Sequence, residues 1–529
     1  MEGRGLSSPL DILKSVYSSA LLLFSVVLVI GLIFTQNTKF SQDVHPAVAF
    51  VVLCVSLVWL NMVEGGQASM VGLPPINRNL YESSHRISSQ ICAVAHKGDN
   101  LDRYLIGRQF MVLAIVFAIH LSASPLEPAI VYGLPAWLLH LFLGSGLGLI
   151  LMTTMIGQLN SQVNSSRCML DYINNYSGLL TLYIALAIEF SGLLHSVYLI
   201  QMFVCCLAGK PMESNEPPKN GLTLVFYWFR ILYSVAILGF SFAVTLTALF
   251  TEKTSAWIHL PNYLSLILFF VIIVVVGILE GMLIAFYAVA KLPKEEQAKA
   301  PWAMKTSNLL FEGEEGKNNL PGFVVGRQIM VTTCFFIVAR LTTLNVDTTD
   351  DDTMNVFGVS DGWQRLFNTG VLGAIIITTV ASISWQLIAS AFPLTFLSFP
   401  LVYIFLRVCL FLEATGICNG AWVLAALHKK VTKFQFDEVY VGTAEDRARS
   451  KIGDEEMSVK SGHLYPGVPA LPARMEGGVM TAAEIANMQV ELAKHQQEVA
   501  DRIKELEVIR KNILAKESAV GDDDEEMQV

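Results

Sequence analysis

Long apolar segments alternate with short polar connections along the first 430 residues of this 529-residue chain. Ten of the segments are long enough for an α-helix to cross a bilayer core, which takes about 20 residues. They cover residues 16–35, 44–63, 104–123, 130–157, 179–207, 222–250, 262–290, 323–344, 366–392 and 394–427. The pattern predicts an all-α polytopic membrane protein with ten transmembrane helices. The short break at Pro393 leaves nine spans, or a re-entrant segment, as alternatives.

The composition agrees with this prediction. Hydrophobic residues make up 53% of the chain and charged residues 15%, whereas soluble domains carry about 25% charged residues. The sequence has no basic stripe for nucleic-acid phosphates and no glycine-rich lysine loop for those of ATP. Its eight cysteines lack the paired spacing of a disulfide framework or a zinc ribbon. We therefore expect a lipid bilayer as partner, no nucleic acid, no metal site and no enzymatic activity.

The two halves of the membrane region repeat each other. Residues 16–38 and 232–254 share nine identical residues at an offset of 216, and Glu64-Gly65 returns at that offset as Glu280-Gly281. Two further matches follow at larger offsets, Gly107-Arg108-Gln109 with Gly326-Arg327-Gln328 and Gln158-Leu159 with Gln386-Leu387. Ordered matches whose offsets grow only by insertions are typical of a duplicated gene.

A duplicated unit with an odd number of spans lies in the membrane in two opposite orientations. We therefore predict two inverted five-helix repeats, an architecture of secondary transporters in which the substrate site lies between the repeats near the membrane midplane. A duplication that only builds a scaffold is the alternative. The predicted parts are a first repeat at 1–210, a linker at 211–221, a second repeat at 222–428, a flexible linker at 429–480, a coiled coil at 481–516 and an acidic disordered end at 517–529.

The tail and the loops carry further signals. Apolar residues at alternating three- and four-residue steps from Ile485 to Ile513 favour a coiled coil that joins copies of the chain or binds a partner. A single amphipathic helix is the alternative. Basic residues at 64–103 and 429–433 place both termini in the cytoplasm. The five lysines of loop 291–322, and the acidic stretch Asp347–Asp352, do not fit this orientation in a ten-span arrangement.

Four ionisable residues near span ends are candidates for function, because an ionisable side chain inside a membrane span is costly. Glu64 and Arg108 in the first half match Glu280 and Arg327 in the second. We predict that both pairs line a substrate cavity. In the alternative interpretation, each glutamate pairs with its arginine only to fix the ends of the helices.

Five glutamines accompany the charged pairs: Gln67, Gln109, Gln158, Gln328 and Gln386. A carboxamide donates and accepts hydrogen bonds without carrying a charge, so the set suits a neutral, hydroxyl-rich solute. The alternative for each glutamine alone is a hydrogen bond between helices. Glu189 and His195 are weaker candidates, for a proton relay or a structural pair, and Glu413 has no matched counterpart.

Taken together, these motifs are similar to those of the silicon transporters of diatoms, a family marked by EGxQ followed by GRQ in each half of a ten-span protein. Here the first EGxQ is Glu64-Gly65-Gly66-Gln67, whereas the second ends in Leu283 in place of glutamine. Both GRQ motifs are intact. Cys168-Met169-Leu170-Asp171 also resembles the CMLD motif of pennate-diatom members, although its Cys and Asp supply two ligands and a zinc site needs three or four. The resemblance covers essentially the whole chain.

The resemblance implies uptake of silicic acid, Si(OH)4, coupled to sodium, across the plasma membrane to supply a silica wall. Silicic acid is largely neutral at seawater pH, so carboxamides and carboxylates can bind its hydroxyls. Sodium would be the coupling ion, with Glu64 and Glu280 as candidate ligands and no other cofactor. Two alternatives stay open, a scaffold or sensor of silica-forming membranes, and a carrier or channel for another small neutral polar solute.

Overall fold

All regular structure in the described part of the chain is helical, apart from two isolated β-bridges. The computed structural model describes residues 9–442 except 39, 42–43, 75, 127–129, 210–215, 217–219, 258–259, 291, 293–296, 298–299, 313–318 and 347–354. The predicted coiled coil, the acidic end and most of the linker at 429–480 lie outside these residues.

Seven helices of the described residues are long and apolar enough to cross a membrane. They are α1 (Pro9–Phe34), α3 (Pro46–Gly72), α5 (Asn100–Ala123), α12 (Leu222–Phe250), α13 (Asn262–Ala290), α16 (Leu320–Thr342) and the continuous run α18–η5–α19 (Val371–Ala391). The pair α6–η2 (Ala136–Gly144) and α7–η3–α8 (Leu147–Ser165), bent by 47°, adds an eighth when it is counted as one pass. The multi-pass prediction is confirmed, but ten spans are not found.

Two of the predicted spans are helical hairpins instead. Residues 179–207 fall into α10 (Tyr176–Phe190) and α11 (Ser196–Ala208), and residues 394–427 fall largely into α21 (Pro400–Ala414) and α22 (Gly420–Thr432). A helix of 15 residues, such as α10, is about 22 Å long, which is short of a hydrocarbon core of roughly 30 Å. The hairpins turn at Gly192 and Gly416, whose φ angles of 84° and 73° are left-handed and end the helix.

The two halves contain the same series of elements. After two long helices comes a short one, α4 (Arg86–Ala95) or α15 (Pro301–Phe311), and then a third long helix. The next pass contains a seven-residue π-helix in both halves, η3 (Thr153–Leu159) or η5 (Ile377–Ile383). Short helices α9 (Met169–Ile173) and α20 (Pro393–Leu397) then lead to hairpins whose helices have 15 and 13 residues in both halves.

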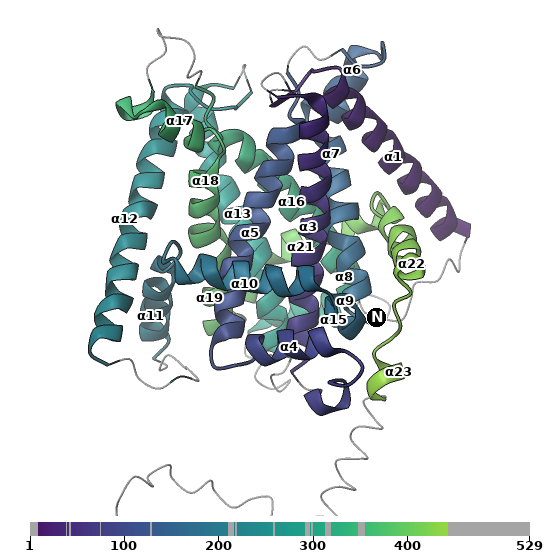
Figure 1. Cartoon of the computed structure of the whole chain (residues 1–529), viewed down its shortest axis with the longest axis vertical. Helices are drawn as coiled ribbons and strands as arrows, with labels where there is room; N and C mark the ends of the chain where they lie inside the picture. The colour runs from purple at the N-terminus through teal and green to yellow at the C-terminus, as the bar shows by residue number, and fades with distance from the viewer. Residues whose placement is uncertain are drawn as a thin grey trace, which may run out of the picture. The chain divides into compact units, whose positions relative to one another are not determined.

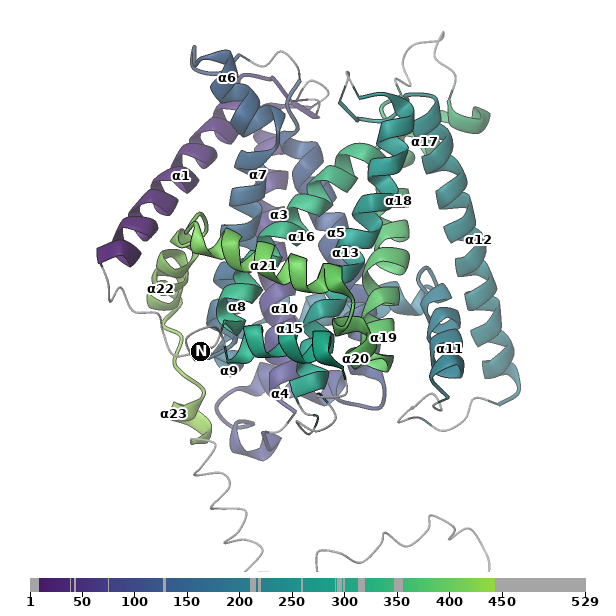
Figure 2. The ribbon, with the colours of Figure 1, turned by 180° about the vertical axis from the view of Figure 1, so that it is seen from behind.

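The two series run in the same direction, so the predicted inverted orientation is wrong. The ends of α5 and α16 lie together, since the His120 ring contacts the Phe336 ring at 6.0 Å and the Arg340 guanidinium donates to Gly144 O at 2.6 Å. Bridges at Thr38 and Thr254 join the ends of α1 and α12 to these same ends. Figures 1 and 2 show α6 and α17 (Asp361–Phe367) at one end, and α4 and α15 at the other. Because each hairpin turns back, a half has an even number of passes and keeps its orientation.

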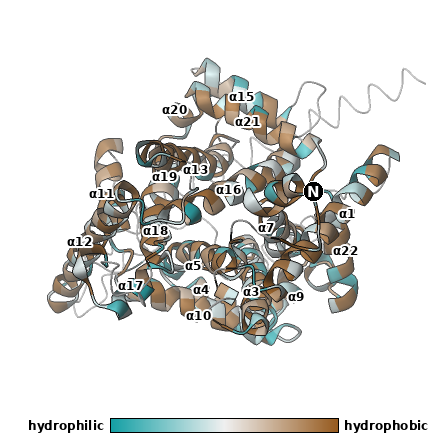
Figure 3. Cartoon of the chain, turned by 90° about the horizontal axis from the view of Figure 1, so that it is seen from above, coloured by the Kyte–Doolittle hydropathy of each residue, from teal (hydrophilic) through white to brown (hydrophobic). Residues whose placement is uncertain are grey.

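Helices α5 and α16 form the centre of the bundle. Of the apolar window of each, 72% is buried, against 44% for α1 and 33% for α12. In the view from above, α5 and α16 lie between the other passes, while α1 and α12 lie at the edges (Figure 3). Large apolar side chains such as Leu23, Val58 and Phe229 are exposed on the outer passes, as expected for surfaces that face lipid. Polar groups on α5 and α16 are therefore held at the centre.

Candidate functional site

The first-half motifs form one buried cluster. Glu64 on α3 faces Arg108 on α5, with 3.7 Å between Oε1 and Nη1. The Arg108 Nη2 donates to Gln109 Oε1 at 2.6 Å, and Gln162 Nε2 on α8 donates to Glu64 Oε2 at 3.2 Å. Glu64, Arg108 and Gln109 are each at most 7% exposed. Since the two opposite charges share this buried place, the cluster is neutral overall.

The second half repeats this cluster. Glu280 on α13 lies 3.6 Å from Arg327 Nη1, measured from its Oε2. The Arg327 Nη2 donates to Gln328 Oε1 at 3.2 Å, and Gln386 Nε2 on α19 donates to Glu280 Oε2 at 3.0 Å. Both halves thus place a glutamate, an arginine and two glutamines on three neighbouring helices in the same order. These distances are those of the alternative interpretation, in which each glutamate pairs with its own arginine. None of these four residues lines the cavities described below, so their place at a substrate cavity stays a prediction.

Glycines of both motifs allow the close packing of these helices. A Cβ at Gly107 would clash with the Ala185 carbonyl of α10, and one at Gly326 would clash with the Cys409 carbonyl of α21. The GRQ glycine therefore lets the first hairpin helix of each half lie directly on the backbone of α5 or α16.

The EGxQ glycines contact aromatic rings. A Cβ at Gly65 would clash with the Tyr172 ring on α9, and one at Gly281 with the Phe396 ring on α20. The Tyr172 hydroxyl also bonds to Asn61 Oδ1 on α3 at 2.6 Å. The short helix after each fourth pass therefore packs against the motif glutamate's own helix.

Hydrogen bonds connect the two clusters across the centre. Gln109 Nε2 donates to Ser382 Oγ on η5 at 3.2 Å, and Gln162 Nε2 lies 3.5 Å from Gln328 Oε1. The Thr332 hydroxyl on α16 donates to Gln158 Oε1 on η3 at 2.6 Å. The polar groups of the two halves therefore meet at one place, where α5 and α16 lie beside the two π-helices.

The structure changes two sequence matches. Because η3 begins at Thr153 and η5 at Ile377, the offset in this region is 224, and Gln386 corresponds to Gln162 rather than to Gln158. Both partners donate to the motif glutamate of their own half. The same offset pairs Glu413 with Glu189, so Glu413 has a counterpart after all. A search at an offset of 224, between the 219 of the GRQ motifs and the 228 of the Gln158 match, would have found both.

The remaining predicted residue, Gln67, lies one helical turn beyond Glu64 on α3 and is half-buried. Its counterpart Leu283 is half-buried as well. This position differs chemically between the halves while the glutamate, arginine and remaining glutamines match. The asymmetry expected from the sequence therefore concerns the edge of the cluster rather than its core.

Sequence reasoning missed hydroxyls of the π-helices. The side chains of Thr153, Thr154, Thr378 and Thr379 are fully buried, and among the described residues their hydroxyls have no hydrogen-bond partner. The same holds for the Nε2 of buried Gln158. Buried polar groups are seldom left unpaired, because each costs free energy. π-Helices in membrane and soluble proteins are often located at functional sites, which could have drawn attention to this segment.

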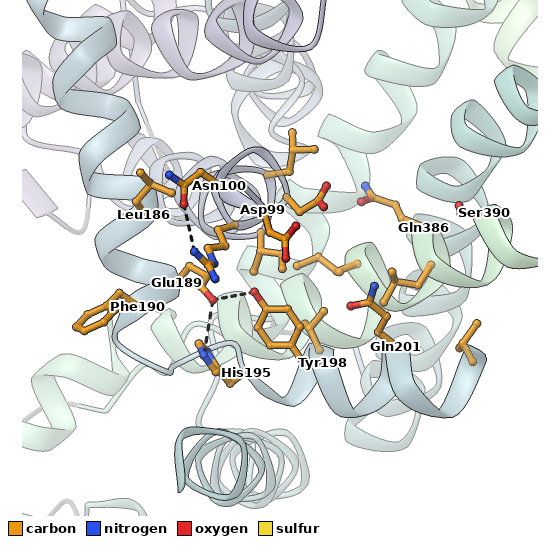
Figure 4. A pocket seen from close by; sticks show the side chains of 18 of the residues that line it. Asp99, Asn100, Leu186, Glu189, Phe190, His195, Tyr198, Gln201, Gln386 and Ser390 are labelled. Carbon is orange, nitrogen blue, oxygen red and sulfur yellow. Dashed lines mark hydrogen bonds and ion pairs between the residues drawn. The ribbon is translucent and has the colours of Figure 1, made fainter. Parts of the chain in front are cut away.

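A cavity of about 1000 Å³ leads to the second cluster. It lies among α5, α10, α11, α12 and α19 and is lined by Gln386 at one wall and by Glu189 at another. Figure 4 shows Gln201 and Gln386 facing this space, with Glu189 bonded to Tyr198 and paired with His195. The Tyr198 hydroxyl donates to Glu189 Oε1 at 2.7 Å, and His195 Nε2 lies 3.6 Å from that oxygen.

The CMLD segment holds the start of the tail rather than a ligand cluster. The Asp437 carboxylate accepts the N–H groups of Met169 and Leu170 at 2.8 and 2.9 Å, and Asp171 Oδ2 accepts the Gln435 N–H at 2.6 Å. Burial raises the pKa of the Cys168 thiol to about 11, whereas a metal ligand must be a thiolate. Within the described residues, no group of three or more His, Cys, Asp or Glu residues could hold a metal ion.

Long apolar passes around a buried polar centre define an integral membrane protein of the multi-pass class. This chain belongs to the silicon transporter family, whose sequence profile matches residues 6–527. Neither the curated proteins nor the solved structures contain a match to it.

Proposed function

We propose that this protein carries silicic acid across a membrane together with sodium, by alternating access of one site shared between its two halves. The observation that supports this most is the pair of matched Glu–Arg–Gln clusters that meet at the centre. The family supports silicic acid as the substrate.

The chemistry of the clusters suits a neutral tetrahydroxide. Each arginine is paired with a glutamate, so the clusters carry no net positive charge that would favour an anionic substrate. The carboxamides of Gln109 and Gln328, and the π-helix hydroxyls, offer donors and acceptors at one place. A net hydrogen bond contributes about 0.5–1.5 kcal/mol, so four hydroxyls satisfied together hold the solute well without charge.

Sodium supplies the driving force that a neutral solute lacks. The candidate ligands are oxygens, those of Glu64 and Glu280 and the hydroxyls of the two π-helices. The carboxylate oxygens lie 3.7 and 3.6 Å from the guanidinium nitrogens they face, which is longer than the short charge-assisted hydrogen bonds of about 2.7–2.9 Å. We infer that the glutamates share their charge between the arginine and a sodium ion.

Cavities at both ends of the bundle support alternating access. The large cavity reaches Gln386 from the end where α5 begins, being lined by Asn100 and Arg103. A smaller cavity of about 220 Å³ lies at the other end, among His120, Ser145 and Arg340. The polar centre lies between them along α5 and α16. Rocking of one half against the other would open each side in turn.

The parallel arrangement also supports a cytoplasmic location for both termini. The helices α4 and α15, from the loops 64–103 and 291–322, lie at the same end of the bundle (Figure 1). Lys305 on α15 therefore lies at the same end as Arg86 on α4, as the positive-inside rule favours for a cytoplasmic end. We propose that the α4–α15 end faces the cytoplasm and that the membrane is the plasma membrane.

Uptake by the purified chain in liposomes tests the proposal. Silicic acid entry is measured with an inward sodium gradient, with equal sodium on both sides, and with potassium in place of sodium. We expect concentrative uptake only with the sodium gradient. Uptake that ignores sodium would contradict the coupling, and a chain that moves no silicic acid under any condition would favour the scaffold or sensor instead.

A further inference from the structure

The two hairpins turn with the same short motif. Glu189-Phe190-Ser191-Gly192 ends α10, and Glu413-Ala414-Thr415-Gly416 ends α21. In each turn the hydroxyl donates to the carbonyl three residues earlier at 2.6 Å and accepts the N–H two residues later at 3.2–3.3 Å. Each glycine takes a left-handed φ. The repeated motif therefore builds two equivalent tips.

Each tip is held by the first pass of the other half. At the first-half tip, Ser234 Oγ on α12 donates to Leu193 O at 2.8 Å and accepts the Ser196 N–H at 2.9 Å. Arg230 lies one helical turn before Ser234 on α12, and its aliphatic carbons pack on the hairpin tip. A Cβ at Gly192 would lie 3.0 Å from Arg230 Cγ. The contacts join elements 38 to 41 residues apart that belong to different halves.

The second-half tip is held in the same way, by residues almost the whole chain away. Ser18 Oγ on α1 donates to Ile417 O at 2.6 Å and accepts the Gly420 N–H at 2.9 Å. A Cβ at Gly416 would lie 2.7 Å from Lys14 Cγ. Lys14 and Ser18 are the residues that match Arg230 and Ser234 at the offset of 216. The hairpin tip of each half is therefore bound by the first pass of the other half, and we call these the exchanged hairpins.

The other end of each hairpin lies on a GRQ motif. Helix α10 carries the Ala185 carbonyl that packs on Gly107, and α21 carries the Cys409 carbonyl that packs on Gly326. Each hairpin therefore connects the first pass of one half with the arginine-bearing helix of the other. These contacts form one continuous path from α12 through α10 to α5, and another from α1 through α21 to α16.

We propose that Ser18 and Ser234 are positioning residues, which tie each exchanged hairpin to the opposite half so that both GRQ motifs move together during transport. This inference rests on the proposed function for its link to uptake. Ser18 and Ser234 are both 0% exposed, and both use donor and acceptor on the tip backbone. The ties stay closed throughout the cycle, so rocking of the halves displaces both hairpins, and with them both GRQ motifs, at the same time.

Matched controls exist on the same helices. Ser25 and Ser241 are also 0% exposed and also match each other at the offset of 216. Their hydroxyls, however, donate only to the carbonyls of Leu21 and Ile237 in their own helices, at 2.8 Å. Replacing them removes a buried hydroxyl of the same kind without touching a hairpin.

The first test compares S18A/S234A with S25A/S241A, at equal amounts of folded protein in liposomes. We expect the maximal uptake rate of S18A/S234A to be about tenfold below the control, or about 1.4 kcal/mol in the barrier. The KM stays within about twofold, because the tie touches no substrate. Equal maximal rates in the two double variants would overturn the proposal.

Hydrogen–deuterium exchange keeps the inference testable even if no variant moves silicic acid. In S18A/S234A, but not in S25A/S241A, backbone exchange should rise at both tips and in the GRQ segments of α5 and α16. Unchanged exchange there would contradict the tie independently of any transport assay. Loss of uptake in wild type and control alike, with this exchange pattern intact, would instead refute the proposed function alone.

Cross-linking tests whether the tie stays closed. The Oγ atoms of Ser196 and Ser234 lie 3.0 Å apart, so cysteines at these positions are placed for a disulfide after small adjustments. We expect oxidised S196C/S234C to transport at least as fast as the same variant when reduced, because the disulfide holds the tip in place of the hydrogen bonds. Reversible loss of uptake on oxidation would show that the tie must open, and failure of the pair to cross-link would contradict the contact itself.

Discussion

Removal of one charge from the first cluster should destabilise the protein strongly. Glu64→Gln leaves the Arg108 guanidinium, 7% exposed at its side chain, without its carboxylate 3.7 Å away. Coulomb's law gives about 4.5 kcal/mol for unit charges at that distance with an effective dielectric constant of about 20. Measured losses for breaking a buried pair are about 3–5 kcal/mol. We therefore expect a lower unfolding temperature and little folded E64Q protein.

Removal of both charges separates stability from transport. In E64Q/R108Q no unpaired charge is left, so most of the lost stability should return. If Glu64 also binds sodium, the double variant should fold but lose the sodium dependence of its uptake. The assay measures unfolding in detergent by intrinsic fluorescence, and initial uptake in liposomes with sodium or potassium outside. E280Q/R327Q is the matched variant of the other half.

Two results would refute this reasoning. If E64Q were as stable as wild type, the pair would not be the buried, mutually balancing contact that its geometry indicates. If E64Q/R108Q folded and kept its full sodium-dependent uptake, Glu64 would have no role in coupling, and the charged pair would only hold α3 and α5 together.

Three further predictions concern packing, reactivity and the tail. Gly107→Ala drives a methyl group into the Ala185 carbonyl and should cost about 1–3 kcal/mol of stability, whereas Gly239→Ala, with no atom within 4 Å, should cost nothing in a size-exclusion assay of folded protein. Since burial raises its pKa to about 11, the Cys168 thiol should be about one part in a thousand thiolate at pH 8 and should resist maleimide until the protein unfolds; rapid native labelling at pH 8, read by mass spectrometry, would disprove this. Asp437→Asn weakens the hydrogen bonds to the backbone N–H groups at the start of α9 and should speed proteolysis at 434–441. Glu438→Gln, the matched change at an exposed neighbour, should leave the proteolysis rate unchanged.

The repeat and much of the site could be predicted from the sequence, because short polar motifs stand out against apolar helices. Glu64 and Arg108, with Glu280 and Arg327, were found from two offsets alone, and the structure brings each pair within 4 Å. Partners that come from a third helix were harder to find. Gln162 was missed because insertions before the π-helices shift the offset to 224. Gln158 lies only four residues before it, and the sequence alone does not show which of the two glutamines matches Gln386.

The number of passes could not be read from hydropathy. A hairpin of two mostly apolar helices, 15 and 13 residues long, has the composition of one long span, and the turn at left-handed Gly192 divides it. This single misassignment changed the number of passes in each half from even to odd, which reversed the orientation of the second half. The five lysines of loop 291–322 were the signal against ten spans, and Lys305 on α15, the one that the structure describes, lies at the same end as α4.

The central claim is that both clusters contribute to one site, and equilibrium binding tests it most directly. Radiolabelled germanic acid, a tetrahydroxide like silicic acid, is titrated onto purified wild type, E64Q/R108Q and E280Q/R327Q in the presence of sodium. We predict one bound molecule per wild-type chain and loss of binding in both variants. Two bound molecules per chain, with one lost in each variant, would show that the halves hold separate sites and would contradict this account.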